Sequence, residues 1–198
     1  MTLKDDRPER LIILGIDPGT VIMGYGVIAV EGKQLTYLAC DHVKFDSKRS
    51  PFERLEDIYV AMGQLLKEHR PDHVAMEAPF FGKNIQSMLK LGRAQGIIMA
   101  ASLAHEASVT EYSPRRVKQA VTGSGAASKE KVAGMVAATY GLSEVPASTD
   151  ASDGLAVATC HAYAINQVIP YQPKAQQSKK KTASSWGAFL KANPDRIQ

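Results

Sequence analysis

Four acidic residues stand at points of the sequence where a folded chain could gather metal ligands. Asp17 follows a continuous apolar run within GIDPGT, and Glu77 ends another apolar stretch within VAMEAPF. Asp150 and Asp153 are three positions apart in a segment expected to begin a helix, so their carboxylates share one helix face. Carboxylate oxygens suit hard divalent ions such as Mg²⁺ or Mn²⁺, and two such ions can hydrolyse a phosphodiester.

Each acid also has a simpler explanation when it is taken alone. Asp17 can close a DPG turn by bonding its own backbone, and Glu77 can be a solvated residue at a sheet rim. An acid at a helix N-terminus stabilises the helix by about 0.3–1 kcal/mol, which accounts for either Asp150 or Asp153. Capping accounts less well for two acids on one face that are followed by the apolar residues 155–158. Spacing alone does not bring the three segments together.

The elements that must position these acids follow from apolar periodicity and turn residues. Three apolar segments joined by short connections predict an antiparallel meander, after which helices and strands alternate. The predicted strands are residues 11–16, 23–30, 35–43, 73–77 and 109–112, and the predicted helices are residues 51–66, 84–106, 114–121, 128–140 and 150–167. This order predicts an α/β fold with a mixed sheet and helices on both faces.

The composition is that of an ordinary globular domain. Of the 198 residues, 44% are apolar and 22% are charged. Cys40 and Cys160 lie far apart and outside any metal-binding spacing, so we interpret them as reduced packing residues, and the histidines show no zinc-binding spacing. We find neither a signal segment nor an apolar run long enough to span a membrane, and we expect a cytoplasmic protein with no membrane contact.

The net charge of +4 is unevenly distributed along the chain. Residues 171–198 contain six basic residues and one acid, and residues 83–131 contain eight basic residues and three acids. A nearly neutral body with a locally basic segment fits a groove for a polyanion beside an acidic site. From charge alone, ordinary solvated side chains are the simpler explanation.

Four motifs in order bring these observations together. GIDPGT with GYG at residues 24–26, then AMEAPFFGKN, VKQAVTGSGAASKEKV and DASDGLAVA, together resemble the RuvC family of bacterial Holliday junction resolvases over residues 11–166. The resemblance implies a ribonuclease H-like fold, a five-stranded mixed sheet whose first three strands are antiparallel. It also implies a structure-selective endonuclease that cuts two opposed strands of a four-way DNA junction and leaves 5′-phosphate and 3′-hydroxyl ends, as recombination and repair require.

The family's four acids match Asp17, Glu77, Asp150 and Asp153. The resemblance implies that Asp17 bridges two metal ions, Mg²⁺ or Mn²⁺, and that Glu77 and Asp153 are further ligands. Asp150 either completes the metal site or orients the attacking water.

The resemblance also implies a DNA-binding surface. Lys118 and Lys129 match family lysines near the cleaved strand, and Phe80 matches an aromatic residue that stacks on an unpaired base. The predicted DNA-binding set is Phe80, Phe81, Lys83, Lys118, Gly123, Gly125, Lys129 and Lys131. Solvated lysines, core aromatic residues and plain turn glycines are the alternatives. Pro79 departs from the bulky apolar residue that is common in the family, which leaves the preferred cleavage sequence open.

Two symmetric cuts call for a two-fold dimer. The predicted interface lies on the helix of residues 84–106 and consists of Met88, Leu89, Gly92 and Gly96, with Met99 on the same helix. Gly92 and Gly96 are spaced (i, i+4) and allow close helix approach, although the same stripe can serve as intramolecular core. The family resemblance adds the RuvA and RuvB branch-migration proteins as expected partners.

We therefore expect a charged extension at residues 1–9, a nuclease domain at residues 10–169 and a basic, disordered tail at residues 170–198. The tail holds three consecutive lysines at 179–181 and an aromatic segment with Trp186, Phe189 and Leu190. It is either a solubilising tail or a non-specific DNA tether with a docking element for a partner.

Three competing functions stay open from the sequence. The first is another ribonuclease H-like nuclease, such as one of the YqgF type that cuts RNA. GIDPGT also resembles the first phosphate loop of actin-like ATPases, but those folds need a duplicated domain for which this chain has no room. The third is a protein that binds junctions without cutting them, although all four acids are present.

Overall fold

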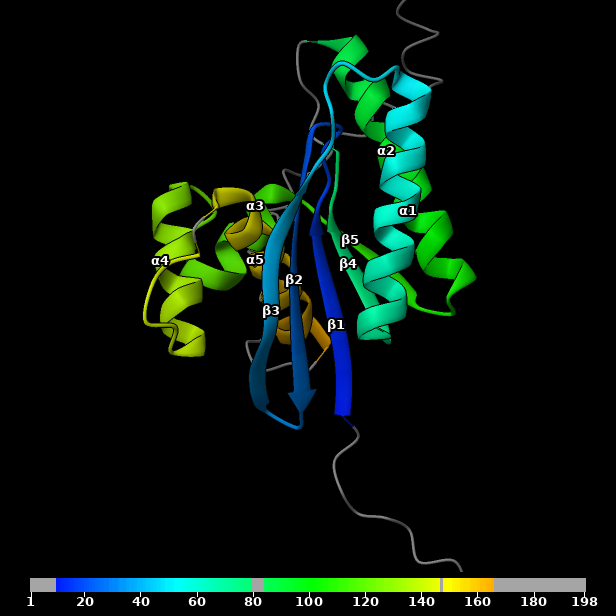
Figure 1. The fold of residues 1–198 in the computed structure, drawn as a ribbon. Coiled ribbons are helices and arrows are strands. Elements are labelled where there is room, and N and C mark those ends of the chain that lie inside the picture. Colours follow the sequence, from blue (N-terminus) through cyan, green and yellow to red (C-terminus); the bar gives the residue numbers. More distant parts are fainter. Residues whose placement is uncertain (1–9, 80–83, 147, 166–198) are drawn as a thin grey trace, which may run out of the picture.

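The computed structural model describes residues 10–79, 84–146 and 148–165. These residues form a five-stranded sheet in the order β3-β2-β1-β4-β5. The strands are β1 (Arg10–Asp17), β2 (Ile22–Glu31), β3 (Gln34–Lys44), β4 (His73–Glu77) and β5 (Ser108–Tyr112). The helices are α1 (Pro51–His69), α2 (Ile85–Ala104), α3 (Pro114–Thr122), α4 (Lys129–Tyr140) and α5 (Thr149–Ile165). Figure 1 shows α1 and α2 on one side of the sheet and α3, α4 and α5 on the other.

The sheet has the mixed topology that the sequence predicted. β1, β2 and β3 form an antiparallel meander, whereas β4 runs parallel to β1 and β5 runs parallel to β4. The parallel neighbours are joined through helices, as parallel strands require. The expectation of a ribonuclease H-like sheet with helices on both faces is confirmed.

Two apolar cores lie on the two faces of the sheet. Alternate residues of β1 point to opposite faces, so Ile13 belongs to the core under α5 while Leu14 and Ile16 belong to the core under α1 and α2. All three side chains are fully buried. Because β1 is covered on both faces, its sequence reads as a continuous apolar run rather than an alternating one.

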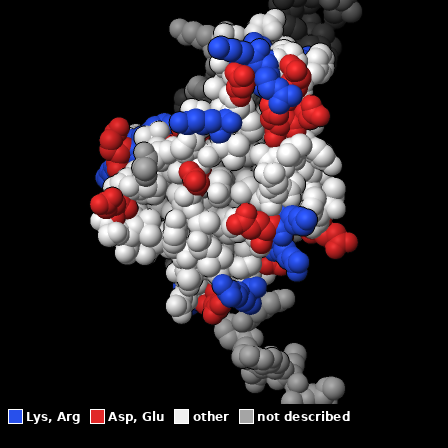
Figure 2. Space-filling model, in the orientation of Figure 1, with Lys and Arg blue, Asp and Glu red and all other residues white. Residues whose placement is uncertain are grey.

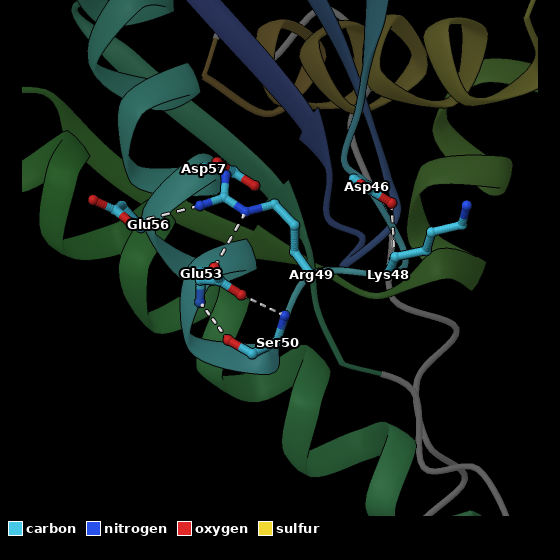
Figure 3. Close-up of polar contacts among 7 residues, drawn as sticks. All are labelled: Asp46, Lys48, Arg49, Ser50, Glu53, Glu56 and Asp57. Atoms are coloured by element: carbon cyan, nitrogen blue, oxygen red, sulfur yellow. Dashed lines mark hydrogen bonds and ion pairs between the residues drawn. The ribbon is translucent and has the colours of Figure 1, made fainter.

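The start of α1 shows why the chain turns into a helix at Pro51 (Figure 3). Ser50 and Glu53 form a reciprocal capping box, in which the Glu53 amide donates to Ser50 Oγ at 3.3 Å and the Ser50 amide donates to Glu53 Oε2 at 2.7 Å. Arg49 makes ion pairs with Glu53, Glu56 and Asp57 on the following turns. These contacts fix the entry into α1.

Glycines allow α5 to lie directly against the sheet. A side chain at Gly154 would place its Cβ 2.6–2.7 Å from the backbone atoms of Tyr25 in β2. A Cβ at Gly15 or Gly26 would likewise collide with the α5 backbone. The small residues therefore set the distance between α5 and the strands, and with it the position of the acids in the first turn of α5.

None of the helices in the described ranges is long and apolar enough to cross a membrane. The expected domain boundaries at residues 9–10 and 169–170 stay predictions, because residues 1–9 and 166–198 lie outside the described ranges. The predicted tail elements, including Trp186, Phe189 and Leu190, also lie outside them.

Gly154→Ala should lower the free energy of unfolding by about 2–3 kcal/mol, because the added methyl collides with the β2 backbone and overpacking of this kind costs about 1–3 kcal/mol. The matched control is Gly134→Ala in α4, where a Cβ would meet nothing within 4 Å. There alanine should raise the free energy of unfolding by about 0.5–1 kcal/mol through its helix propensity. Urea unfolding measures both, and equal effects of the two variants would refute the close-packing account.

Candidate active site

Asp17 and Glu77 end neighbouring parallel strands. Asp17 is the last residue of β1 and Glu77 the last residue of β4, and Ile16 stands opposite Met76 in the register that joins the two strands. Ligand sites of open α/β sheets gather at the carboxyl ends of parallel strands. Both side chains are half-buried at the same edge of the sheet, so the topology places these two predicted ligands side by side.

The first turn of α5 brings Asp150 and Asp153 to this edge. Gly24 stands opposite Asp17 in the β1–β2 register, and its α-carbon is in contact with the backbone of Asp150. Ser148 caps the helix, since its Oγ accepts hydrogen bonds from the amides of Asp150 at 3.2 Å and Ala151 at 3.4 Å. Because the Ser148 side chain caps α5, the two acids are not needed for that task.

The pKa values of Asp17 and Glu77 reflect the carboxylates around them. Burial, followed by the charges of Glu77, Asp153 and Asp150, raises the pKa of Asp17 to about 7, and the Lys129 ammonium counteracts the rise. Burial and the charge of Asp153 also raise the pKa of Glu77. Such a cluster needs a cation to hold all its carboxylates in the ionised form.

Lys129 supplies one positive charge to the cluster. It is the first residue of α4, whose N-terminus is capped by Ser128, and its Nζ donates to Asp153 Oδ2 at 2.6 Å. The hydrogen bond to Asp153 raises the pKa of Lys129. Lys118, in α3, lies near enough to lower the pKa of Glu77. Two of the predicted DNA-binding lysines therefore lie within the field of the carboxylates.

The donor chemistry of this cluster fits hard divalent cations. Its ligating atoms are carboxylate oxygens, which prefer Mg²⁺ or Mn²⁺ and argue against zinc. Within the described residues, however, no three His, Cys, Asp or Glu side chains already surround a common point at metal-ligand spacing. The acids share one edge of the sheet, and the Asp153 carboxylate pairs with Lys129.

The structure describes five of the eight predicted DNA-binding residues. Gly123 is the left-handed C-cap of α3 with φ 76°, so its role as a turn residue is established. Gln119 braces the same loop, since its side chain donates to Gly123 O at 2.6 Å and accepts from the Gly125 amide at 3.0 Å. Lys131 is exposed in the first turn of α4. Phe80, Phe81 and Lys83 lie outside the described ranges.

The face of the molecule drawn in Figure 2 carries basic and acidic side chains mixed together. Lysines and arginines there are interspersed with aspartates and glutamates rather than gathered in one patch.

The predicted dimer residues lie on the outer side of α2. Leu89 is 55% exposed, and a Cβ at Gly92 or Gly96 would meet nothing within 4 Å. Met88 is partly buried, and Met99 packs against the core shared with α1. The single chain therefore leaves Leu89, Gly92 and Gly96 free for another surface, while Met99 belongs to the intramolecular core.

One residue that supports the site had no signal in the sequence. Gln95 is 3% exposed in α2, and its Nε2 donates to the backbone oxygen of Glu77 at 3.0 Å. The bond anchors the end of β4 to the helix that carries Gly92 and Gly96. A glutamine within a mostly apolar helix gave no hint of this partner, because the partner lies 18 residues earlier in another element.

The raised pKa of Asp17 predicts how the metal-free protein responds to pH. The folded chain binds the Asp17 proton more tightly than the unfolded chain, so the free energy of unfolding should fall as pH rises from about 4 to 7. Asp17→Asn replaces this carboxyl with an amide that does not titrate. Its free energy of unfolding should exceed that of the wild type by roughly 2–4 kcal/mol at pH 8 and nearly equal it at pH 4.

Urea unfolding in EDTA at several pH values measures the difference. Asp41→Asn is the matched control, because the Asp41 side chain is 66% exposed on β3 and away from the cluster. A difference between Asp17→Asn and the wild type that stays constant from pH 4 to pH 8 would refute the crowded-carboxylate account.

Comparisons with known proteins agree with the geometry. The family model for the crossover junction endodeoxyribonuclease RuvC matches residues 13–161. A RuvC from Christiangramia forsetii is 43% identical over 196 residues, which cover 99% of this chain and 95% of the relative. A RuvC from Porphyromonas gingivalis is also 43% identical, over 96% of this chain and 99% of the relative.

Solved structures give the same result. RuvC from Thermus thermophilus in complex with a Holliday junction substrate superposes with a TM-score of 0.74 at 35% identity, over 79% of this chain and 96% of that one. The yeast mitochondrial resolvase Ydc2, at 14% identity and a TM-score of 0.57, shares the fold. The length of the match, its identity and the ordered carboxylates together show that the chain belongs to the RuvC family of crossover junction endodeoxyribonucleases.

Proposed function

We propose that the protein resolves four-way DNA junctions, acting as a homodimer that hydrolyses one phosphodiester in each of two opposed strands. The observation that carries the proposal is the cluster of Asp17, Glu77, Asp150 and Asp153 at one edge of the sheet beside Lys129. Membership of the family supports the same activity, as does the likeness to a relative that was solved with a Holliday junction substrate. Resolution of junctions is a step of DNA recombination and repair. We also propose that the protein acts in the cytoplasm.

In this proposal the four carboxylates hold two Mg²⁺ or Mn²⁺ ions per subunit. Bound divalent cations would supply Lewis-acid stabilisation of the phosphoryl oxygens and activation of water. Asp17, the most strongly perturbed of the acids, has to lose its proton before it can serve as a ligand. Asp150 would either complete the metal site or orient the attacking water.

Lysine side chains of the protein would bind the DNA phosphate at the cleavage site. Lys118 and Lys129 flank the carboxylates, and an ammonium near a scissile phosphate both holds the backbone and stabilises charge in the transition state. We propose that Lys131, Gly123 and Gly125 also contact the DNA backbone. We propose that Phe80, Phe81 and Lys83 complete the contact with DNA, and that RuvA and RuvB are partners of the resolving complex.

A cleavage assay tests the proposed function. A labelled four-way junction, a linear duplex and an RNA–DNA hybrid are incubated with the protein in Mg²⁺, in Mn²⁺ or in EDTA. The junction should be nicked symmetrically in the presence of either metal, and the other substrates should stay intact. Asp17→Asn should lower the rate by more than about 100-fold, because even outer-shell partners of a metal are worth 10–100-fold. Cleavage of the hybrid instead of the junction would favour an RNA-cutting relative, and cleavage in EDTA would refute a metal site.

The proposed dimer rests on the outer face of α2. Leu89→Glu places a charge on an exposed leucine and should weaken self-association at least about tenfold without unfolding the monomer. Met135→Glu is the control, because Met135 is a 40% exposed apolar residue of α4 on the opposite side of the sheet. Sedimentation velocity across a concentration series measures both. A Leu89→Glu variant that dimerises as the wild type does would move the interface away from this face.

A further inference from the structure

The position of Lys129 is unfavourable for its own helix. It is the first residue of α4, where the helix dipole is positive and where acids, not lysines, stabilise the helix by about 0.3–1 kcal/mol. Its neighbour Glu130 is the residue type that this position favours. The local structure of α4 therefore does not explain why a lysine stands there.

The neighbouring carboxylates explain why a lysine stands at the start of α4. Lys129 Nζ donates to Asp153 Oδ2 at 2.6 Å, and the same ammonium interacts with Asp17 and Asp150. Within the described residues, no other salt bridge reaches any of the four acids. Lys129 therefore supplies the positive charge that a bound cation would supply. It pairs with Asp153, whose side chain is 16% exposed.

A divalent cation bound to Asp153 would compete with the Lys129 ammonium for the negative charge of this carboxylate. Two cations a few ångströms apart repel strongly in a partly buried site, and the ion carries twice the charge of the lysine. Either the lysine or the ion neutralises this acid.

We propose that Lys129 is an internal counter-ion, which pairs with Asp153 in the metal-free protein and is displaced from it when a divalent cation binds. The displaced ammonium is then available to a DNA phosphate, so that metal loading prepares the phosphate contact. The inference rests on the proposed function, since it assumes that Asp153 is a metal ligand.

The lysine is free to make this exchange. Its side chain is 56% exposed, so it can leave Asp153 for solvent without disturbing a core. Its backbone stays fixed, because Ser128 Oγ accepts a hydrogen bond from the Lys131 amide at 3.3 Å and holds the N-terminus of α4. A rotation of the side chain alone accomplishes the swap.

Manganese binding to the full chain without DNA tests the proposal. Electron paramagnetic resonance of free Mn²⁺ gives the dissociation constant for the wild type and for Lys129→Met, which keeps an unbranched side chain one atom shorter and removes its charge. Lys129→Met should bind Mn²⁺ about 3–10-fold more tightly, because the ion no longer competes with an ion pair. Lys131→Met is the matched control, since Lys131 lies in the same helical turn and should change the dissociation constant by less than about twofold.

The outcomes separate this inference from the proposed function. If the wild type binds Mn²⁺ no better than Asp17→Asn does, the proposed metal site itself is refuted. If binding depends on Asp17 but Lys129→Met binds with unchanged or lower affinity, the counter-ion is refuted and the metal site stands. An equal gain in Lys131→Met would also overturn it, because the effect would then be one of general charge.

A second measurement observes the exchange directly. In protein labelled with ¹⁵N-lysine, the ammonium resonance of Lys129 can be assigned by its loss in Lys129→Arg. Titration with Mg²⁺ should shift this resonance with the same midpoint as metal binding, while the resonance of Lys131 should not move. An unchanged Lys129 resonance at saturating Mg²⁺ would show that the lysine stays on Asp153 and would overturn the proposal.

Discussion

The mutual repulsion of four carboxylates at one edge of the sheet is the constraint on which the rest of this structure depends. The fold forces Asp17 and Glu77 together by ending two parallel strands side by side, and α5 adds Asp150 and Asp153 from above. Burial, together with the charges of the neighbouring acids, raises the pKa of Asp17 to about 7, so ionised Asp17 destabilises the metal-free chain. A protein tolerates such a site when cations are part of its working state.

The scaffold is rigid where this repulsion acts. Glycines in β1, β2 and α5 allow the helix to touch the strands, and its buried apolar side chains hold it against them. Ser148 and Ser128 fix the N-termini of α5 and α4, and Gln95 fixes the end of β4. The remaining freedom lies in side chains, above all in Lys129, which makes the choice of counter-ion a local event.

Much of this arrangement could be predicted from residues alone. The predicted helix starts lie within one residue of the observed ones, and the strand of Glu77 was predicted with its observed bounds, because these signals are local. The pairing of β1 with β4 could not be derived from spacing, since it depends on tertiary packing; the family motifs supplied it. Neither the Lys129–Asp153 pair nor the Gln95 contact had a signal, because each joins two elements whose separation in sequence carries no pattern.

The central claim is that these carboxylates form a divalent-cation site, and the most direct test is to locate the cation. Crystals of the protein soaked in Mn²⁺ can be measured at the manganese absorption edge. The account predicts anomalous density in contact with the carboxylates of Asp17 and Glu77, with Lys129 turned away from Asp153. Anomalous density elsewhere, or none beside Asp17 at saturating Mn²⁺, would contradict it.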